Sequence, residues 1–184
     1  MGRVANVEDL DEIEFQAVRT GNHVRAAVQM SELAQQAEPG LRAEFHLRAG
    51  EQWMSADDPQ RAADEFTAAI ADGGCTFADP RVLLARALLD LERDTEAQEL
   101  ISGLTADREV VTPRTCDLLA ELFTEEGDLR GALDWATTGV ERCIQLEDDA
   151  ELQLLLRLRY RIRVDLGLAE DDYDRMLDAT MPRG

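Results

Sequence analysis

Apolar side chains recur at helical spacing through most of this chain. Leu84, Leu88 and Leu91, for example, are separated by four and three residues, which places them on one side of a helix. An Asp or Thr directly before a proline predicts the start of a helix. Its side chain accepts a hydrogen bond from a backbone amide of the first turn that has no partner within the helix. The pattern predicts ten helices, over residues 7–20, 22–37, 41–55, 58–72, 80–92, 95–105, 113–126, 128–145, 149–166 and 169–178.

The pattern also repeats about every 35 residues. A small residue recurs at Ala26, Ala62, Ala97 and Ala132, and the residue four positions after most of them is large and apolar. This period is typical of two antiparallel helices that stack on the next pair. It predicts an all-α solenoid of four hairpins, over 7–40, 43–76, 78–111 and 113–146, followed by a C-terminal helical cap over 147–184.

The segment 157–163 is ambiguous, because its arginines alternate with apolar residues as they would on an amphipathic strand. A lone strand in a helical chain would lack a pairing partner, so a helix is favoured. A helix splits the arginines into two pairs, Arg157 with Arg161 and Arg159 with Arg163. The interpretation is a closing helix whose arginines meet nearby acids, and the alternative is a basic docking patch. Candidate acids are Asp148, Asp149, Glu170 and Asp171.

The repeats resemble the tetratricopeptide repeat family. In the second repeat, Gly50, Trp53, Ala62, Phe66 and Ala69 stand at that family's spacing of small and aromatic residues. The resemblance covers about residues 7–146 and implies a right-handed superhelix of stacked antiparallel helix pairs. Four positions depart from the pattern, namely Glu14, His46, Arg81 and Ala136.

In that family the first helix of each pair lines a concave wall where extended peptides or helices bind. The resemblance therefore implies an acidic groove with apolar anchors. The family's clamp of Lys, Arg and Asn for chaperone tails is missing here, so that ligand is disfavoured. The partner-binding residues implied by position are Glu8, Asp11, Phe15, Arg19, Glu44, Leu47, Glu51, Met54, Arg86, Leu89, Asp90, Asp117 and Glu121.

The charge balance narrows the range of partners. The chain has 19 basic residues, all arginine, against 39 acidic ones, for a formal net charge of -20. Such a chain repels nucleic acid, so we expect a basic or neutral protein or peptide partner and no nucleic acid. No run reaches the length of a membrane span, and three widely spaced cysteines favour a reducing compartment. We therefore expect a cytoplasmic protein with no membrane partner.

Residues that could bind a metal or take part in catalysis are few and scattered. His23 and His46 lack the i, i+4 partner of a helical metal site, and the sequence contains no nucleophile-elbow serine and no glycine-rich phosphate loop. We therefore expect no metal, no cofactor and no catalytic residues. The leading hypothesis is a non-catalytic protein-interaction module, an adaptor or scaffold. The alternatives are a self-association module that forms a homodimer through its terminal helices, and a sensor domain of a regulator.

Overall fold

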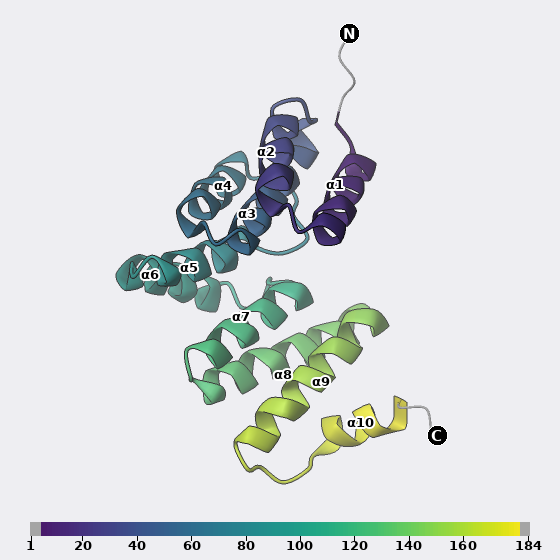
Figure 1. Ribbon diagram of the computed structural model, residues 1–184. Coiled ribbons are helices and arrows are strands. Elements are labelled where there is room, and N and C mark those ends of the chain that lie inside the picture. The colour runs from purple at the N-terminus through teal and green to yellow at the C-terminus, as the bar shows by residue number, and fades with distance from the viewer. Residues whose placement is uncertain (1–4, 181–184) are drawn as a thin grey trace. The chain divides into compact units, whose positions relative to one another are not determined.

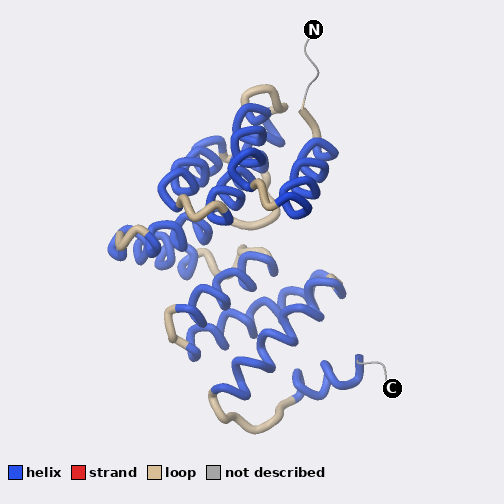
Figure 2. Tube along the Cα trace, viewed as in Figure 1, coloured by secondary structure: helices blue, strands red, loops and turns tan. Residues whose placement is uncertain are grey.

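The computed structural model describes residues 5–180, and this part of the chain is helical throughout, apart from turns and one isolated bridge between Ala5 and Ala37 (Figures 1 and 2). The all-α prediction is confirmed. Within this range the helices are α1 (Val7–Thr20), α2 (His23–Ala34), α3 (Pro39–Ser55), α4 (Pro59–Asp72), α5 (Pro80–Asp90), α6 (Asp94–Ala106), α7 (Pro113–Glu125), α8 (Leu129–Leu146), α9 (Asp149–Asp165) and α10 (Asp172–Thr180).

The predicted helix starts before proline are confirmed. The side chains of Asp58, Asp79 and Thr112 each accept a hydrogen bond from a backbone amide in the first turn of α4, α5 and α7. The helix α3 starts two residues earlier than predicted, with Pro39 in its first turn. Proline is tolerated there because backbone N–H groups in the first turn have no intrahelical acceptor, so the N–H that proline lacks is not needed. The residues of 157–163 lie in α9, so the helical alternative holds for that segment.

The chain divides into two compact units. The first extends to Arg108 and holds α1 to α6, and the second begins at Glu109 and holds α7 to α10. Within each unit a helix packs mainly against the next helix in the chain, and the first helices of successive pairs also meet, α1 with α3, α3 with α5, and α7 with α9. This is the packing of a helical repeat. The right-handed superhelix stays a prediction.

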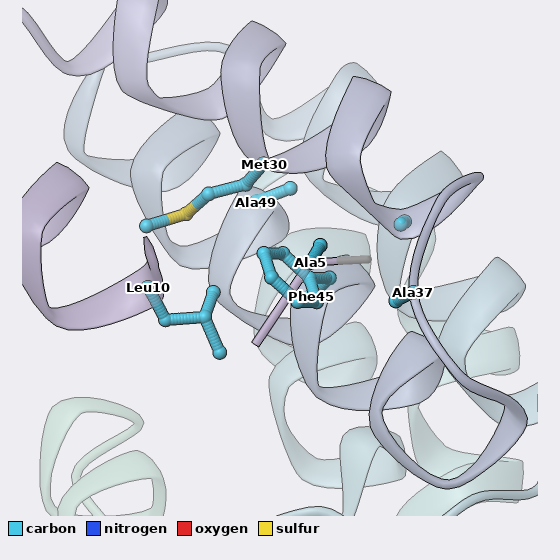
Figure 3. Packing of buried hydrophobic residues seen from close by; sticks show 7 residues of the cluster. Ala5, Leu10, Met30, Ala37, Phe45 and Ala49 are labelled. Carbon is cyan, nitrogen blue, oxygen red and sulfur yellow. The ribbon is translucent and has the colours of Figure 1, made fainter. Parts of the chain in front are cut away.

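The small residues of the repeat are core positions. Ala26, Ala62, Ala97 and Ala132 are all buried, which agrees with the 35-residue period. In the first unit, Figure 3 shows Leu10 of α1 and Met30 of α2 beside the fully buried ring of Phe45 of α3. Their burial removes apolar surface from water and fixes α1 and α2 on α3. What remains outside this core decides which surfaces are open to a partner.

The C-terminal helices form a second core. Val140 and Cys143 of α8 pack with Leu155 and Leu156 of α9 and with Leu177 of α10. The short helix α10 is thus seated on α8 and α9 rather than projecting alone. Among residues 5–180, no helix is both long and apolar enough to cross a bilayer.

Candidate binding surface

The predicted wall residues of α1 lie on one open side of the helix. Leu10 and Ala17 face the core, whereas Glu8, Asp11, Phe15 and Arg19 are exposed. The Phe15 side chain is 60% exposed, and the Arg19 guanidinium lies 6.0 Å from its ring centroid. The structure therefore brings these four predicted residues together on one helix. We call the whole exposed side the α1 face, which comprises Glu8, Asp11, Glu12, Phe15, Val18 and Arg19.

Local sequence holds α1 firmly. Asn6 accepts from the amide of Asp9 and the Asp9 carboxylate accepts from the amide of Asn6, which forms a reciprocal cap at the N-terminus. Gly21 ends the helix in the left-handed region, at φ 69°. A side chain there would be strained, so this turn suits glycine. The α1 face is consequently displayed on a defined helix rather than on a loop.

The prediction that Leu47 is an apolar anchor is wrong. Its side chain is fully buried on α3. The physical reason is that α3 is an interior helix that packs against α1, α2, α4 and α5, so far more of its circumference is covered than that of the end helix α1. Met54 on the same helix is half-buried.

The predicted acidic residues of α3 form ion pairs with Arg48. Its guanidinium donates to Glu44 at 2.8 Å and to Glu14 of α1 at 3.0 Å, and lies 3.8 Å from Glu51. It also stacks 4.1 Å from the ring centroid of Phe77, whose backbone amide donates to Glu44 at 3.0 Å. Glu44 and Glu51 are therefore engaged within the unit. Sequence reasoning missed this cluster, although Arg48 follows Glu44 by four residues and precedes Glu51 by three.

The electrostatics of this cluster favour the charged state of Arg48. Partial burial acts to lower the pKa of its guanidinium, but the hydrogen bond to Glu44 and the charges of Glu14 and Glu51 raise that pKa above its usual value. The guanidinium is thus a fixed positive charge at the centre of the expected acidic wall. It ties α1, α3 and the segment before α5 together.

The remaining predicted residues of the first unit are only partly available. Arg86 and Leu89 of α5 are half-buried, and Asp90 at the end of that helix is exposed. Exposed predicted residues of this unit therefore gather on α1. Val18 is 79% exposed and extends the apolar part of the α1 face.

In the second unit the prediction for Asp117 as a surface residue is wrong. Its side chain is 8% exposed and accepts from Arg114 at 2.5 Å, while Glu121 is half-buried. Burial raises the pKa of Asp117 to about 6, with a smaller opposing effect of Arg114 and further upward effects of Glu121 and Glu151. Arg114, the donor to Asp117, lies 4.0 Å from Glu151 of α9, so this carboxyl is close to the contact between α7 and α9.

A second polar contact crosslinks three helices of the first unit. Glu65 of α4 accepts from the Ser31 hydroxyl of α2 at 2.6 Å, and its other oxygen lies 2.7 Å from Nδ1 of His46 on α3. The carboxylate stands between the serine and the imidazole, so this arrangement gives the serine no imidazole base of the kind that activates a nucleophile. His46 is therefore a partly buried histidine in the seam between α3 and α4.

The arginines of α9 divide as predicted. Arg159 is buried and donates to Asp171 at 2.6 Å and to Thr137 at 3.0 Å. It also lies 3.4 Å from Asp174, to which Arg163 donates at 2.9 Å. The hydrogen bond from Arg159 lowers the pKa of Asp171 to about 2. The pair Arg159 and Arg163 therefore holds α10, as expected for a closing helix, whereas Arg157 and Arg161 are exposed.

Hollows open on the described surface, and three of them lie beside the elements discussed above. One of about 320 Å³ lies between α1 and α2, and one of about 400 Å³ lies between α8 and the end of α9. The third, of about 170 Å³, lies between α9 and α10. Residues 5–180 contain no cluster of three or more His, Cys, Asp or Glu side chains arranged to hold a metal ion.

Neither a protein-family model nor a curated protein sequence matches this chain. The likeness to tetratricopeptide repeats thus stays a resemblance carried by the spacing of the small and aromatic residues.

Proposed function

We propose that this protein is a non-catalytic interaction module of the tetratricopeptide type, and that it binds a basic and apolar segment of a partner protein on the α1 face. The proposal rests above all on one observation: Phe15 and Val18 are exposed on the same side of α1 as Glu8 and Asp11. Within residues 5–180 neither of these two carboxylates forms an ion pair.

Large exposed apolar side chains surrounded by charge are typical of interaction sites. An aromatic anchor supplies buried area at a helix surface, and the surrounding carboxylates select a partner of opposite charge and accelerate its encounter. The buried Leu47 and the paired Glu44 and Glu51 reduce the predicted groove to its N-terminal part. The proposed site is accordingly narrower than the sequence indicates.

The cysteines support a proposed compartment. Cys75, Cys116 and Cys143 are free thiols, and an unpaired set of three suits a reducing environment. We propose a cytoplasmic location on this ground, where the partner would be another cytoplasmic protein.

The test uses synthetic helical peptides as probes. A short amphipathic helix with arginines beside its apolar stripe is compared with a second peptide that carries glutamates at the same positions. Binding to the full chain is followed by fluorescence anisotropy at about 0.05 M and about 0.5 M salt. We expect the basic peptide to bind in preference to the acidic one and to weaken in high salt.

Variants of the chain locate the site. The pair F15A and V18A is expected to weaken binding about tenfold or more, and the pair E8R and D11R is expected to reverse the charge preference. Ile70→Ala on α4 and Glu99→Arg on α6 are matched exposed controls on other helices of the same unit and should leave affinity unchanged. Equal affinity of the control and α1 variants would contradict the proposal.

A further inference from the structure

The second unit presents an open helix side that complements the α1 face. On α9, Leu155 and Ile162 face the core, and the opposite side carries Arg157 and Arg161. Leu154 is 50% exposed and Val164 is 57% exposed on that side. We call these four residues, Leu154, Arg157, Arg161 and Val164, the α9 face.

The two arginines of the α9 face have no counter-charge of their own. Within residues 5–180 neither Arg157 nor Arg161 forms an ion pair or a side-chain hydrogen bond. Asp171, just before α10, and Asp174 on α10 are held by the other side of α9 through Arg159 and Arg163. A basic and apolar side is thus left open on a chain of strong negative charge.

We propose that the α9 face of one copy of this chain docks on the α1 face of a second copy. The inference rests on the proposed function and names the partner of that site as a second molecule of the same protein. Two observations support it: the α1 face and the α9 face have opposite charge, and their charged and apolar residues have the same spacing. The basic and apolar segment that the α1 face would select is present on α9 itself.

The spacing of the two faces agrees in detail. Glu8, Glu12 and Phe15 are separated by four and three residues, and Arg157, Arg161 and Val164 have the same separations. If the helices run parallel, each glutamate meets an arginine and Phe15 meets Val164. If they run antiparallel, Glu8 meets Arg161 and Glu12 meets Arg157.

In the antiparallel case Phe15 meets Leu154, because Leu154 precedes Arg157 by three residues as Phe15 follows Glu12 by three. Both directions therefore pair the charges and set Phe15 against an exposed apolar residue of the α9 face. Among residues 5–180, the exposed Glu12 makes only an intrahelical hydrogen bond, from Gln16, and it can accept an arginine of another molecule.

A contact between like faces is disfavoured on the same grounds. Two α9 faces would bring Arg157 and Arg161 of one copy against those of the other, and two α1 faces would oppose carboxylates. Like charges in contact across an interface are costly. The contact therefore joins different faces of the two copies, an α1 face to an α9 face.

The net charge of -20 does not prevent this contact. Two copies repel at long range, but the screening length is about 8 Å at physiological salt, so the repulsion between distant charges is damped while contacting pairs still attract. One helix face on each side is smaller than a standard interface, so the association is weak and depends on concentration.

The test is sedimentation of the full chain over a wide range of concentration at about 0.15 M salt. We expect the average mass to rise with concentration. The α9 variant R157E/R161E and the α1 variant E8R/E12R should each weaken self-association about tenfold or more. Glu99→Arg serves as the charge-reversal control and should associate as the wild type does.

A charge-exchange experiment distinguishes loss of the proposed contact from a general loss of folding in the variants. A mixture of the α9 variant and the α1 variant should associate although each alone does not, because the intact α1 face of one meets the intact α9 face of the other. A chain with all four substitutions should also regain self-association. Loss of association in the single-face variants without recovery in either experiment would overturn the proposal.

Other outcomes are equally decisive. A chain that stays monomeric at every concentration, or that forms a dimer insensitive to the α1 substitutions, would overturn the inference. So would saturable binding of the acidic helical peptide to the α9 face without self-association, since it would identify a different occupant. Binding of the basic peptide to a monomeric chain would leave the proposed function standing while this inference falls.

Discussion

A Cβ atom placed on Gly50 of α3 would lie 2.4 Å from the Cε1 atom of Phe66 on α4. No side chain fits at that distance, so the glycine allows the two helices of the hairpin to approach and the phenylalanine to fill the space between them. Both residues are fully or almost fully buried. This contact is the structural basis of the small and aromatic positions in the second repeat.

Gly50→Ala is expected to destabilise the fold. The added methyl must displace a ring that packing holds in place, which costs about 1–3 kcal/mol and outweighs the helix propensity of alanine, about 1 kcal/mol. Gly103→Ala on α6 is the control, because its nearest neighbour would be a flexible guanidinium at 3.7 Å. That substitution should be neutral or stabilising. Denaturant unfolding of the two variants measures the difference, and equal stability would contradict the packing argument.

Removal of the Arg48 guanidinium is expected to loosen the first unit. Arg48→Met leaves Glu14, Glu44 and Glu51 without their common counter-charge and should cost about 2–3 kcal/mol. Hydrogen exchange should rise in α1 and in the segment around Phe77, which Arg48 connects. Arg25→Met removes an exposed arginine of α2 and should change stability by less than about 0.5 kcal/mol. Unchanged exchange in α1 would show that the cluster does not hold it.

Replacement of an arginine by methionine should affect the stability of the protein differently in the two arginine pairs of α9. Arg159→Met removes the buried guanidinium that Asp171 and Asp174 share and leaves them Arg163, so we expect a loss of about 2–3 kcal/mol and early proteolysis of α10. Arg157→Met, two residues away and exposed, should change stability by less than about 0.5 kcal/mol. Similar losses in both variants would contradict the assignment of Arg159 as the residue that holds α10.

The buried carboxyl of Asp117 should make stability fall as pH rises. Its pKa in the folded chain is about 6, above the unfolded value, so the folded state binds the extra proton and this contribution disappears above that pKa. The effect amounts to about 1.4 kcal/mol between pH 5 and pH 8. Asp117→Asn cannot titrate, so its stability relative to the wild type should rise by this amount over the same range. A constant difference between the two proteins would show that Asp117 does not titrate there.

The three thiols should differ in reactivity. Cys75 is exposed, Cys116 is buried, and burial with the nearby charges of Asp148 and Glu151 raises the pKa of Cys143 to about 12. Thiolates are the reactive form, so Ellman's reagent should modify one thiol rapidly in the native protein and all three in denaturant. Cys75→Ser should abolish the rapid phase. A rapid phase that survives this substitution would contradict the burial of the other two.

The helices are predictable from the sequence because their signals are local. Asp58 and Asp79 precede prolines, and each acts within three residues of itself. Burial around a helix depends instead on how many neighbours surround it. Leu47 and Asp11 occupy equivalent positions 36 residues apart, yet one lies on an interior helix and the other on an end helix, and only the second is exposed.

The polar contacts of the candidate site were only partly predictable. Asp117 follows Arg114 by three residues, so their pairing has a local signal. Glu65 and His46 are separated by 19 positions, and Arg48 meets Glu14 across 34. No spacing rule links such residues before the helices are placed in space. The separation of Arg159 from Arg157 was predictable as soon as a helix was assumed, since it follows from helical geometry alone.

Packing of each helix on its neighbours in the chain has a kinetic consequence. Most native contacts join residues that are close in sequence, so the chain closes only short loops before favourable contacts begin to form. Proteins with this property fold rapidly, on a scale of about microseconds to milliseconds. A newly made chain would therefore expose its apolar helix sides only briefly.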